Sequence, residues 1–183
     1  FAAAIAGLSP QTARADCSPN NPAAGTTVVC SGDDTNGFTS GADNLDVTVL
    51  PDATVTGGGL NVIGLNGNFN TVTNNGTITA PDGRGIHAES NSTIINNGTI
   101  STGVLFGGDG IQVQGPRNTI TNNGTISTTA NNASGINLSD SDNTVINSGS
   151  ILTAGNGATG INVSSSDSAV TNSGLIQVTG NSN

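Results

Sequence analysis

The stretch that decides the fold is a nine-residue segment that recurs along the second half of the chain. Its copies read TVTNNGTIT (71–79), TIINNGTIS (93–101), TITNNGTIS (119–127), TVINSGSIL (144–152) and AVTNSGLIQ (169–177). Their glycines, from Gly76 to Gly174, lie 22, 26, 25 and 25 residues apart. Between them GIHA, GIQV, GINL and GINV begin at residues 85, 110, 135 and 160. Two motifs that keep the same period indicate a structural repeat.

Each repeat contains three short runs in which apolar and polar residues alternate, separated by Gly or Asn-Gly. This alternation predicts three strands of four or five residues per unit. A propeller blade needs four strands and about 40 residues, so a 25-residue unit of three strands does not fit a propeller. The sequence therefore predicts an all-β, right-handed parallel β-helix, with about 25 residues per coil and coils stacked about 4.8 Å apart.

Stacked coils place equivalent residues in columns, which we call files. The central apolar file is predicted to be Ile78, Ile100, Ile126, Ile151 and Ile176. The residue two positions before each repeat glycine is predicted to form an internal amide ladder, namely Asn74, Asn96, Asn122, Asn147 and Asn172. Asn tolerates the backbone of a tight corner, and amides one coil apart can hydrogen-bond to one another.

The composition excludes several functions. The 183 residues carry a net charge of −9, with 8% charged and 2% aromatic residues, one Glu and no Lys. Helical bundles rely on Glu, Lys and Arg, so they are excluded. Binding of nucleic acid requires basic side chains for the phosphates, so it is not expected.

The first residues are typical of an export signal. The apolar run FAAAIAGL (1–8) is followed by Ala13-Arg14-Ala15, which fits a signal-peptidase site, so residues 1–15 are interpreted as a signal remnant. A buried helix is the alternative. Two cysteines, Cys17 and Cys30, then flank a Pro- and Asn-rich loop. In an exported chain they predict a disulfide, with a metal or redox site as the alternative.

Residues 16–44 show no repeat and are predicted to cap the N-terminal edge, and residues 45–183 are predicted to form the coils. The first coil is degenerate, with DVTV from Asp46, ATV from Ala53 and GLNVIG from Gly59. Leu60 lies 26 residues before Ile86, and this spacing predicts that the two residues are equivalent.

Few residues are candidates for chemistry. The single His, His87, is expected to face solvent on its strand. Asp142 and Asp167 are predicted to lie one coil apart in one column, with their carboxylates separated by about the 5 to 5.5 Å of retaining glycosidases. Arg117 falls in the same column one coil earlier and is expected to form a surface ion pair with Asp142. Weak cation binding and ordinary solvated turns are the alternatives for these carboxylates.

GGDGI (107–111) occurs once and indicates a tight turn, since calcium-binding nonapeptides occur in tandem. The Asn-Gly-Thr triplets at Asn75, Asn97 and Asn123 match glycosylation acceptors but are explained by the turn. No catalytic, cofactor-binding or metal residue is assigned.

Three features together resemble a known family. DCSPNNPAAGTTVVCSG (16–32), ADNLDVTVLPDATVTGGG (42–59) and the serial NNGTI coils are similar to the N-terminal part of autotransporter passenger domains, the type V secretion proteins of alphaproteobacteria. The resemblance implies export, further coils or a C-terminal β-barrel downstream, and display at the bacterial cell surface or outer membrane, or release outside the cell.

The protein is therefore expected to be a non-enzymatic surface protein that acts in adhesion or aggregation or as a rigid display stalk. The expected partner is a host or cell-surface ligand or another copy of the chain, without membrane insertion of this segment. A self-assembling extracellular fibre subunit and a polysaccharide-degrading β-helix are the alternatives.

Overall fold

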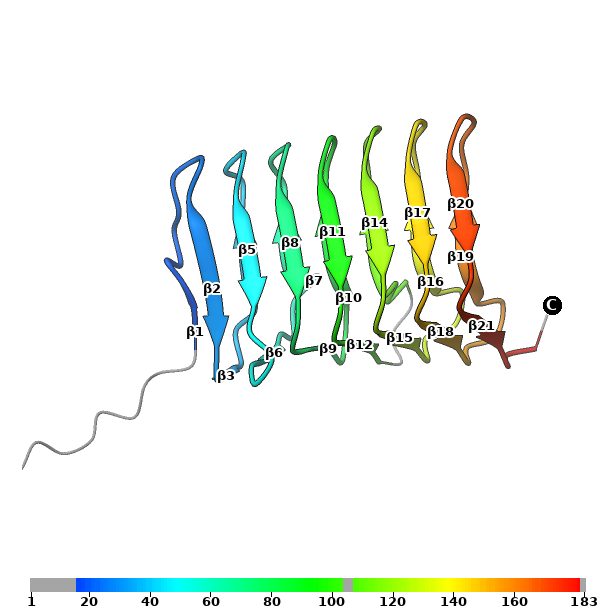
Figure 1. The fold of residues 1–183 in the computed structure, drawn as a ribbon. Helices are drawn as coiled ribbons and strands as arrows, with labels where there is room; N and C mark the ends of the chain where they lie inside the picture. The colour runs from blue at the N-terminus through cyan, green and yellow to red at the C-terminus, as the bar shows by residue number, and fades with distance from the viewer. Residues whose placement is uncertain (1–15, 104–106, 182–183) are drawn as a thin grey trace, which may run out of the picture.

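The structure is a computed structural model that describes residues 16–103 and 107–181. The predicted signal remnant, residues 1–15, lies outside the described residues. The described chain is all-β and winds around three parallel sheets (Figure 1). The predicted parallel β-helix is confirmed.

Sheet 1 has eight strands in the order β1-β2-β5-β8-β11-β14-β17-β20. Their bounds are β1 Asp16–Ser18, β2 Thr27–Ser31, β5 Asp46–Val49, β8 Thr71–Asn74, β11 Thr93–Asn96, β14 Thr119–Asn122, β17 Thr144–Asn147 and β20 Ala169–Asn172. Sheet 2 has seven strands, namely β3 Asp33–Asp34, β6 Thr54–Thr56, β9 Thr77–Ala80, β12 Thr99–Thr102, β15 Thr125–Thr128, β18 Ser150–Thr153 and β21 Leu175–Val178. Sheet 3 has six strands, namely β4 Phe38–Ser40, β7 Asn61–Leu65, β10 Arg84–Ala88, β13 Ile111–Val113, β16 Ser134–Leu138 and β19 Thr159–Val163.

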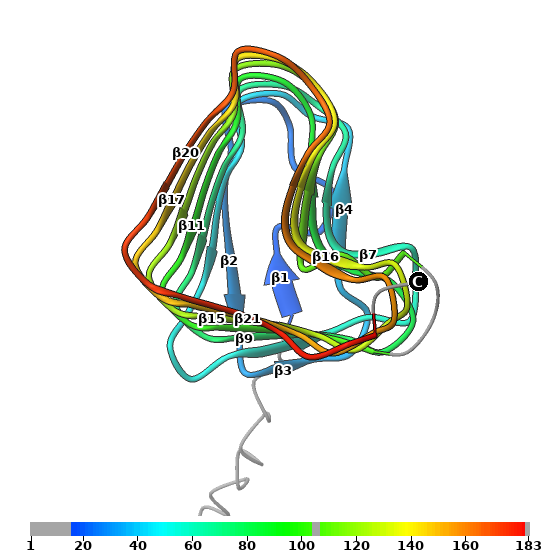
Figure 2. The same cartoon turned by 90° about the vertical axis from the view of Figure 1, so that its right-hand side faces the viewer.

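Figure 2 looks along the stack from the C-terminal coils. The chain descends sheet 1, crosses sheet 2 and ascends sheet 3 while it advances toward the viewer, which is a right-handed winding. Each strand therefore pairs with its equivalent in the next coil, as in the parallel pairs Ile94↔Ile120 and Ile100↔Ile126.

The core is a stack of aliphatic files. Ile78, Ile100, Ile126 and Ile151 are fully buried, whereas Ile176 is 37% exposed because it lies in the last described coil. Gly110 allows this packing, because a Cβ on it would collide with Cγ2 of Ile126 and with the carbonyl of Gly135. β-branched side chains suit such a pleated surface, and each buried one contributes about 1.5 to 3 kcal/mol.

The amide ladder lies inside the corner between sheets 1 and 2. Each Nδ2 donates to the Oδ1 of the next Asn, at 2.8, 2.8, 2.7 and 2.6 Å from Asn74 to Asn172. The neighbouring triplet asparagines form a second, exposed ladder, in which Asn97 Nδ2 donates to Asn75 Oδ1 and Asn123 Nδ2 to Asn97 Oδ1. The amide nitrogens of Asn97 and Asn123 are engaged in this ladder, which agrees with a role of the triplets in the turn.

A third polar file was missed by sequence analysis. It lies at the corner from sheet 3 to sheet 1, where each side chain accepts a hydrogen bond from a backbone N–H of the preceding coil. For example, Asn70 Oδ1 accepts from Leu45 N, and Asn118 Oδ1 accepts from Ser92 N. The file comprises Asn70, Ser92, Asn118, Asn143 and Ser168. These side chains satisfy backbone N–H groups that the turn would otherwise leave unpaired.

Two predictions about the first coils are wrong in detail. Residues 27–40 already form a coil, because β2, β3 and β4 pair in parallel with β5, β6 and β7. Only β1 departs from the pattern, since it pairs antiparallel with β2. Leu60 is not equivalent to Ile86, because Ile63 pairs with Ile86 and Leu60 is 70% exposed in the preceding turn.

The disulfide joins β1 to β2. Cys17 and Cys30 are directly opposite in the antiparallel pair, and their sulfurs are bonded. The buried carboxylate of Asp34 accepts from Cys17 N at 2.9 Å, which ties the same strand to β3. The bond therefore holds the closing strand on the first coil.

We expect both cysteines to resist alkylation in the unreduced protein and to react after reduction. Intact mass before and after a reductant measures this. Loss of the bond should lower the free energy of unfolding by about 3 kcal/mol, because it closes a short loop in the unfolded chain. Two alkylated thiols without reductant would contradict the pairing.

Candidate functional site

A column of chemically varied side chains lies at the corner between sheets 3 and 1. We call it the corner column, and its members are Asn44, Phe69, Asn91, Arg117, Asp142 and Asp167. All six have left-handed backbone, with φ between 56° and 61°. The corner is the row of aligned loops at the top of Figure 1, where each strand of sheet 1 begins. The column therefore presents one side chain per coil.

The local sequence explains this backbone. Each member directly precedes the position that folds inward at the corner, which is occupied by Asn70 after Phe69 and by Asn143 after Asp142. The backbone must reverse there, and a left-handed residue makes that reversal in one step. Backbone bonds join successive members' loops, as from Phe69 N to Ser90 O at 3.1 Å and from Asn91 N to Pro116 O at 3.0 Å.

The structure places the predicted trio of Arg117, Asp142 and Asp167 in successive coils of this column, all exposed. Asp142 Oδ2 accepts from Ser141 Oγ at 3.2 Å. The one ion pair within residues 16–103 and 107–181 joins His87 to Glu89, so the expected pair of Arg117 with Asp142 is not formed. Across the same ranges no three His, Cys, Asp or Glu side chains are grouped as metal ligands.

Phe69 is one of three members that sequence analysis missed, together with Asn44 and Asn91. Its side chain is 58% exposed, in a column otherwise filled by amides and charges. Asn and Asp adopt the left-handed region readily, but a bulky aromatic residue rarely does. The signal that could have found it is its position directly before Asn70-Thr71-Val72, which matches Asp142 before Asn143-Thr144-Val145.

We expect Phe69→Asn to raise the free energy of unfolding by about 1 kcal/mol, because Asn relieves the backbone strain. Phe69→Ala is the matched control, since it also removes the exposed ring but keeps the left-handed penalty. Urea unfolding of the three proteins measures the difference. An equal gain in both variants would locate the effect in the ring and contradict the backbone explanation.

His87 lies elsewhere, on the outer face of sheet 3. Its neighbours across the strands are Gly64 and Gln112. The prediction that it faces solvent is wrong, since His87 is only 5% exposed. The reason is curvature: a Cβ on Gly64 would lie 3.3 Å from the Cβ of Asn61, so side chains three residues apart converge on this face. Figure 2 shows the chain turning where it enters sheet 3.

Polar side chains continue along this face. His87 Nε2 lies 3.3 Å from Glu89 Oε1. The buried carboxylate of Asp109 accepts from Ser134 N at 2.6 Å and from Asn137 Nδ2 at 2.9 Å. GGDGI is thus a turn whose aspartate braces the next coil.

Several polar atoms of this face have no hydrogen-bond partner among the described residues. They are Asn61 Oδ1, Arg84 Nε, His87 Nδ1 and Gln112 Oε1. These atoms are covered by their neighbours, so the face is a packed polar layer. The exposed corner column is the surface on which a ligand has direct access.

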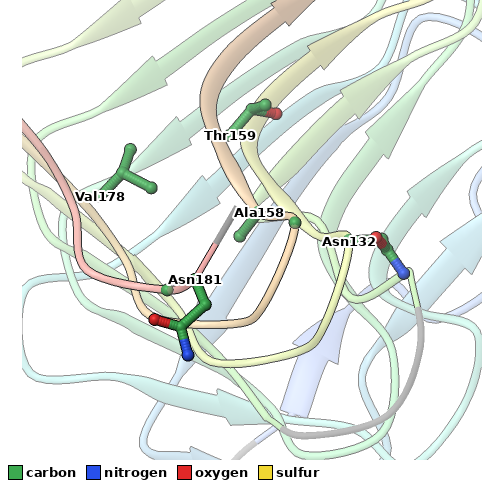
Figure 3. A pocket seen from close by; sticks show the side chains of 7 residues that line it. Asn132, Ala158, Thr159, Val178 and Asn181 are labelled. Atoms are coloured by element: carbon green, nitrogen blue, oxygen red, sulfur yellow. The ribbon is translucent and has the colours of Figure 1, made fainter. Parts of the chain in front are cut away.

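Two hollows lie near the last described coils. The larger, of about 300 Å³, is lined by two asparagine amides, Ala158, Thr159 and Val178 (Figure 3). Asn132 and Asn181 supply those amides from separate loops, and no titratable side chain lines the hollow. Its polar lining is therefore uncharged.

Comparisons with known proteins leave the geometry as the main guide to function. No family model, no curated protein and no solved structure matches the chain. In the described ranges, no helix has the length and apolar character needed to cross a bilayer.

Proposed function

We propose that the protein is an exported, non-enzymatic β-solenoid of the bacterial cell surface that acts in adhesion or aggregation or as a rigid display stalk. In this proposal it is a passenger segment of an autotransporter. The observation that carries it is the corner column, an exposed row of varied side chains held at regular intervals on a rigid rod.

The rod itself supports a role in display. Parallel pairing continues without a break from β2 to β20 in sheet 1, and internal ladders join the coils. Each coil contacts mainly its neighbours, so length is gained by adding coils. The Cys17–Cys30 disulfide supports folding in an oxidising compartment, as expected for an exported protein.

The arrangement of titratable groups favours binding over catalysis. His87 is buried, and its only hydrogen-bond partner in the described part of the chain is Glu89. Asp142 and Asp167 are exposed on serine-rich turns, where Ser141 Oγ donates to Asp142 Oδ2. In a catalytic pair of carboxyl groups, the surroundings usually keep one group protonated and the other ionised.

Display of the protein on a non-adherent bacterial strain tests the proposal. Adhesion to epithelial cells and sedimentation by autoaggregation should both be measured, with an Ile126→Asp variant, which is expected to unfold, as the control. Adhesion or aggregation by the wild type alone supports the proposal. Equal values for both proteins would overturn adhesion and aggregation as its roles, and release of reducing sugars from polysaccharide by the wild type would overturn a non-enzymatic function.

A further inference from the structure

We propose that Phe69 and its column neighbours Asn44 and Asn91 form a site for one ring of a saccharide, with Phe69 as the stacking platform. The inference rests on the proposed surface function and names its ligand class. Two independent observations point to Phe69, namely an exposed aromatic ring and a strained backbone at the same residue.

The strain matters because the fold does not require Phe at this position. Four of the six column positions use Asn or Asp for the same turn, and these residues fit left-handed backbone better than Phe69 or Arg117 does. Backbone strain that the fold does not require is concentrated at binding and catalytic sites. The exposed ring makes no compensating contribution to the core, so its presence indicates a contact outside the chain.

The two neighbouring asparagines indicate which class of ligand the Phe69 ring contacts. Asn44 lies one coil before Phe69 and Asn91 one coil after it, and adjacent coils are about 4.8 Å apart. An aromatic face between two amides offers apolar contact in the middle and hydrogen-bond donors and acceptors on both sides. A sugar ring has the complementary arrangement, with C–H groups on its face and hydroxyls around its edge.

Other ligands fit less well. A peptide that binds by strand addition needs an open sheet edge, and the corner between two sheets provides none. A helical peptide needs several apolar anchors in a groove, whereas Phe69 stands alone among polar residues. Nucleic acid also stacks on aromatics but requires basic charge, and this chain has a net charge of −9.

Nuclear magnetic resonance of ring-labelled Phe tests the proposal, because the chain has only four Phe residues. The probes are β-1,4-linked and β-1,3-linked glucose hexamers and a galacturonic acid hexamer, with an Asn-rich peptide as a further probe. Binding of at least one saccharide should shift one ring signal in a saturable way. That signal is assigned to Phe69 by its loss in Phe69→Asn.

Three variants make the result decisive. Phe69→Asn should weaken binding about tenfold or more although it stabilises the fold, so unfolding cannot explain the loss. Phe69→Tyr should restore binding, because it keeps the aromatic face. Leu60→Asn, at an exposed apolar residue of the opposite corner, between sheets 2 and 3, should leave binding unchanged.

The proposal is overturned if no saccharide gives a saturable shift, if only the peptide does, or if Phe69→Asn binds as tightly as the wild type. Adhesion by the displayed protein together with such a result would leave the surface function standing and remove only the saccharide site.

Discussion

Ile126→Asp is expected to abolish cooperative folding or to lower the free energy of unfolding by several kcal/mol. Ile126 is fully buried between Ile100 and Ile151 of the adjacent coils. An aspartate there would bury an unpaired charge and remove the aliphatic contacts of three coils. Thermal unfolding followed by circular dichroism measures the loss.

Asp142→Asn is the matched control for this experiment. Asp142 is exposed with φ at 59°, and Asn accepts that backbone equally well. The control should change the free energy of unfolding by less than about 0.5 kcal/mol. Comparable losses in the two variants would mean that the inner and outer faces of the strands are assigned wrongly.

Asn122→Ala is expected to lower the free energy of unfolding by about 3 kcal/mol, because it cuts the internal ladder. Asn122 Oδ1 accepts from Asn96 Nδ2 at 2.8 Å, and its Nδ2 donates to Asn147 Oδ1 at 2.7 Å. All three amides are completely buried, so the broken bonds cannot be replaced by water. Chemical unfolding at equilibrium gives the value.

Asn123→Ala tests the same chemistry at the surface. Asn123 Nδ2 donates to Asn97 Oδ1 at 2.9 Å, but this ladder is exposed. Water replaces an exposed hydrogen bond, so the expected loss is below about 1 kcal/mol. If Asn123→Ala lowers the free energy of unfolding as much as Asn122→Ala does, the buried ladder has no special role in stability.

The repeat made most of the fold predictable. A period near 25 fixes which residues stack, so Ile100 over Ile126 and Asn96 over Asn122 follow from counting. Each interior position must pack against the equivalent position of the next coil, which is why the pattern is regular. The first coil was harder, because residues 27–40 keep the geometry of the repeat without its sequence.

The site was less predictable because it depends on curvature and backbone conformation. Alternation correctly puts His87 on the outer side of its strand, but only the bend of sheet 3 explains why it is buried there. Arg117, Asp142 and Asp167 were placed in one column by their spacing. Phe69 was missed, although the Asn-Thr-Val that follows it marks its position, because a bulky aromatic residue rarely adopts left-handed backbone.

Successive coils hold neighbouring residues of the corner column one coil spacing apart. The pair Asp142→Cys and Asp167→Cys tests it, since adjacent strands are about 4.8 Å apart and a disulfide spans such a distance. Peptide mapping of the oxidised protein should show a bond between positions 142 and 167. The control pair, Asp142→Cys with Asp52→Cys, should not form one. Failure of the first pair to bond, or equal bonding of both pairs, would contradict the stacked corner column.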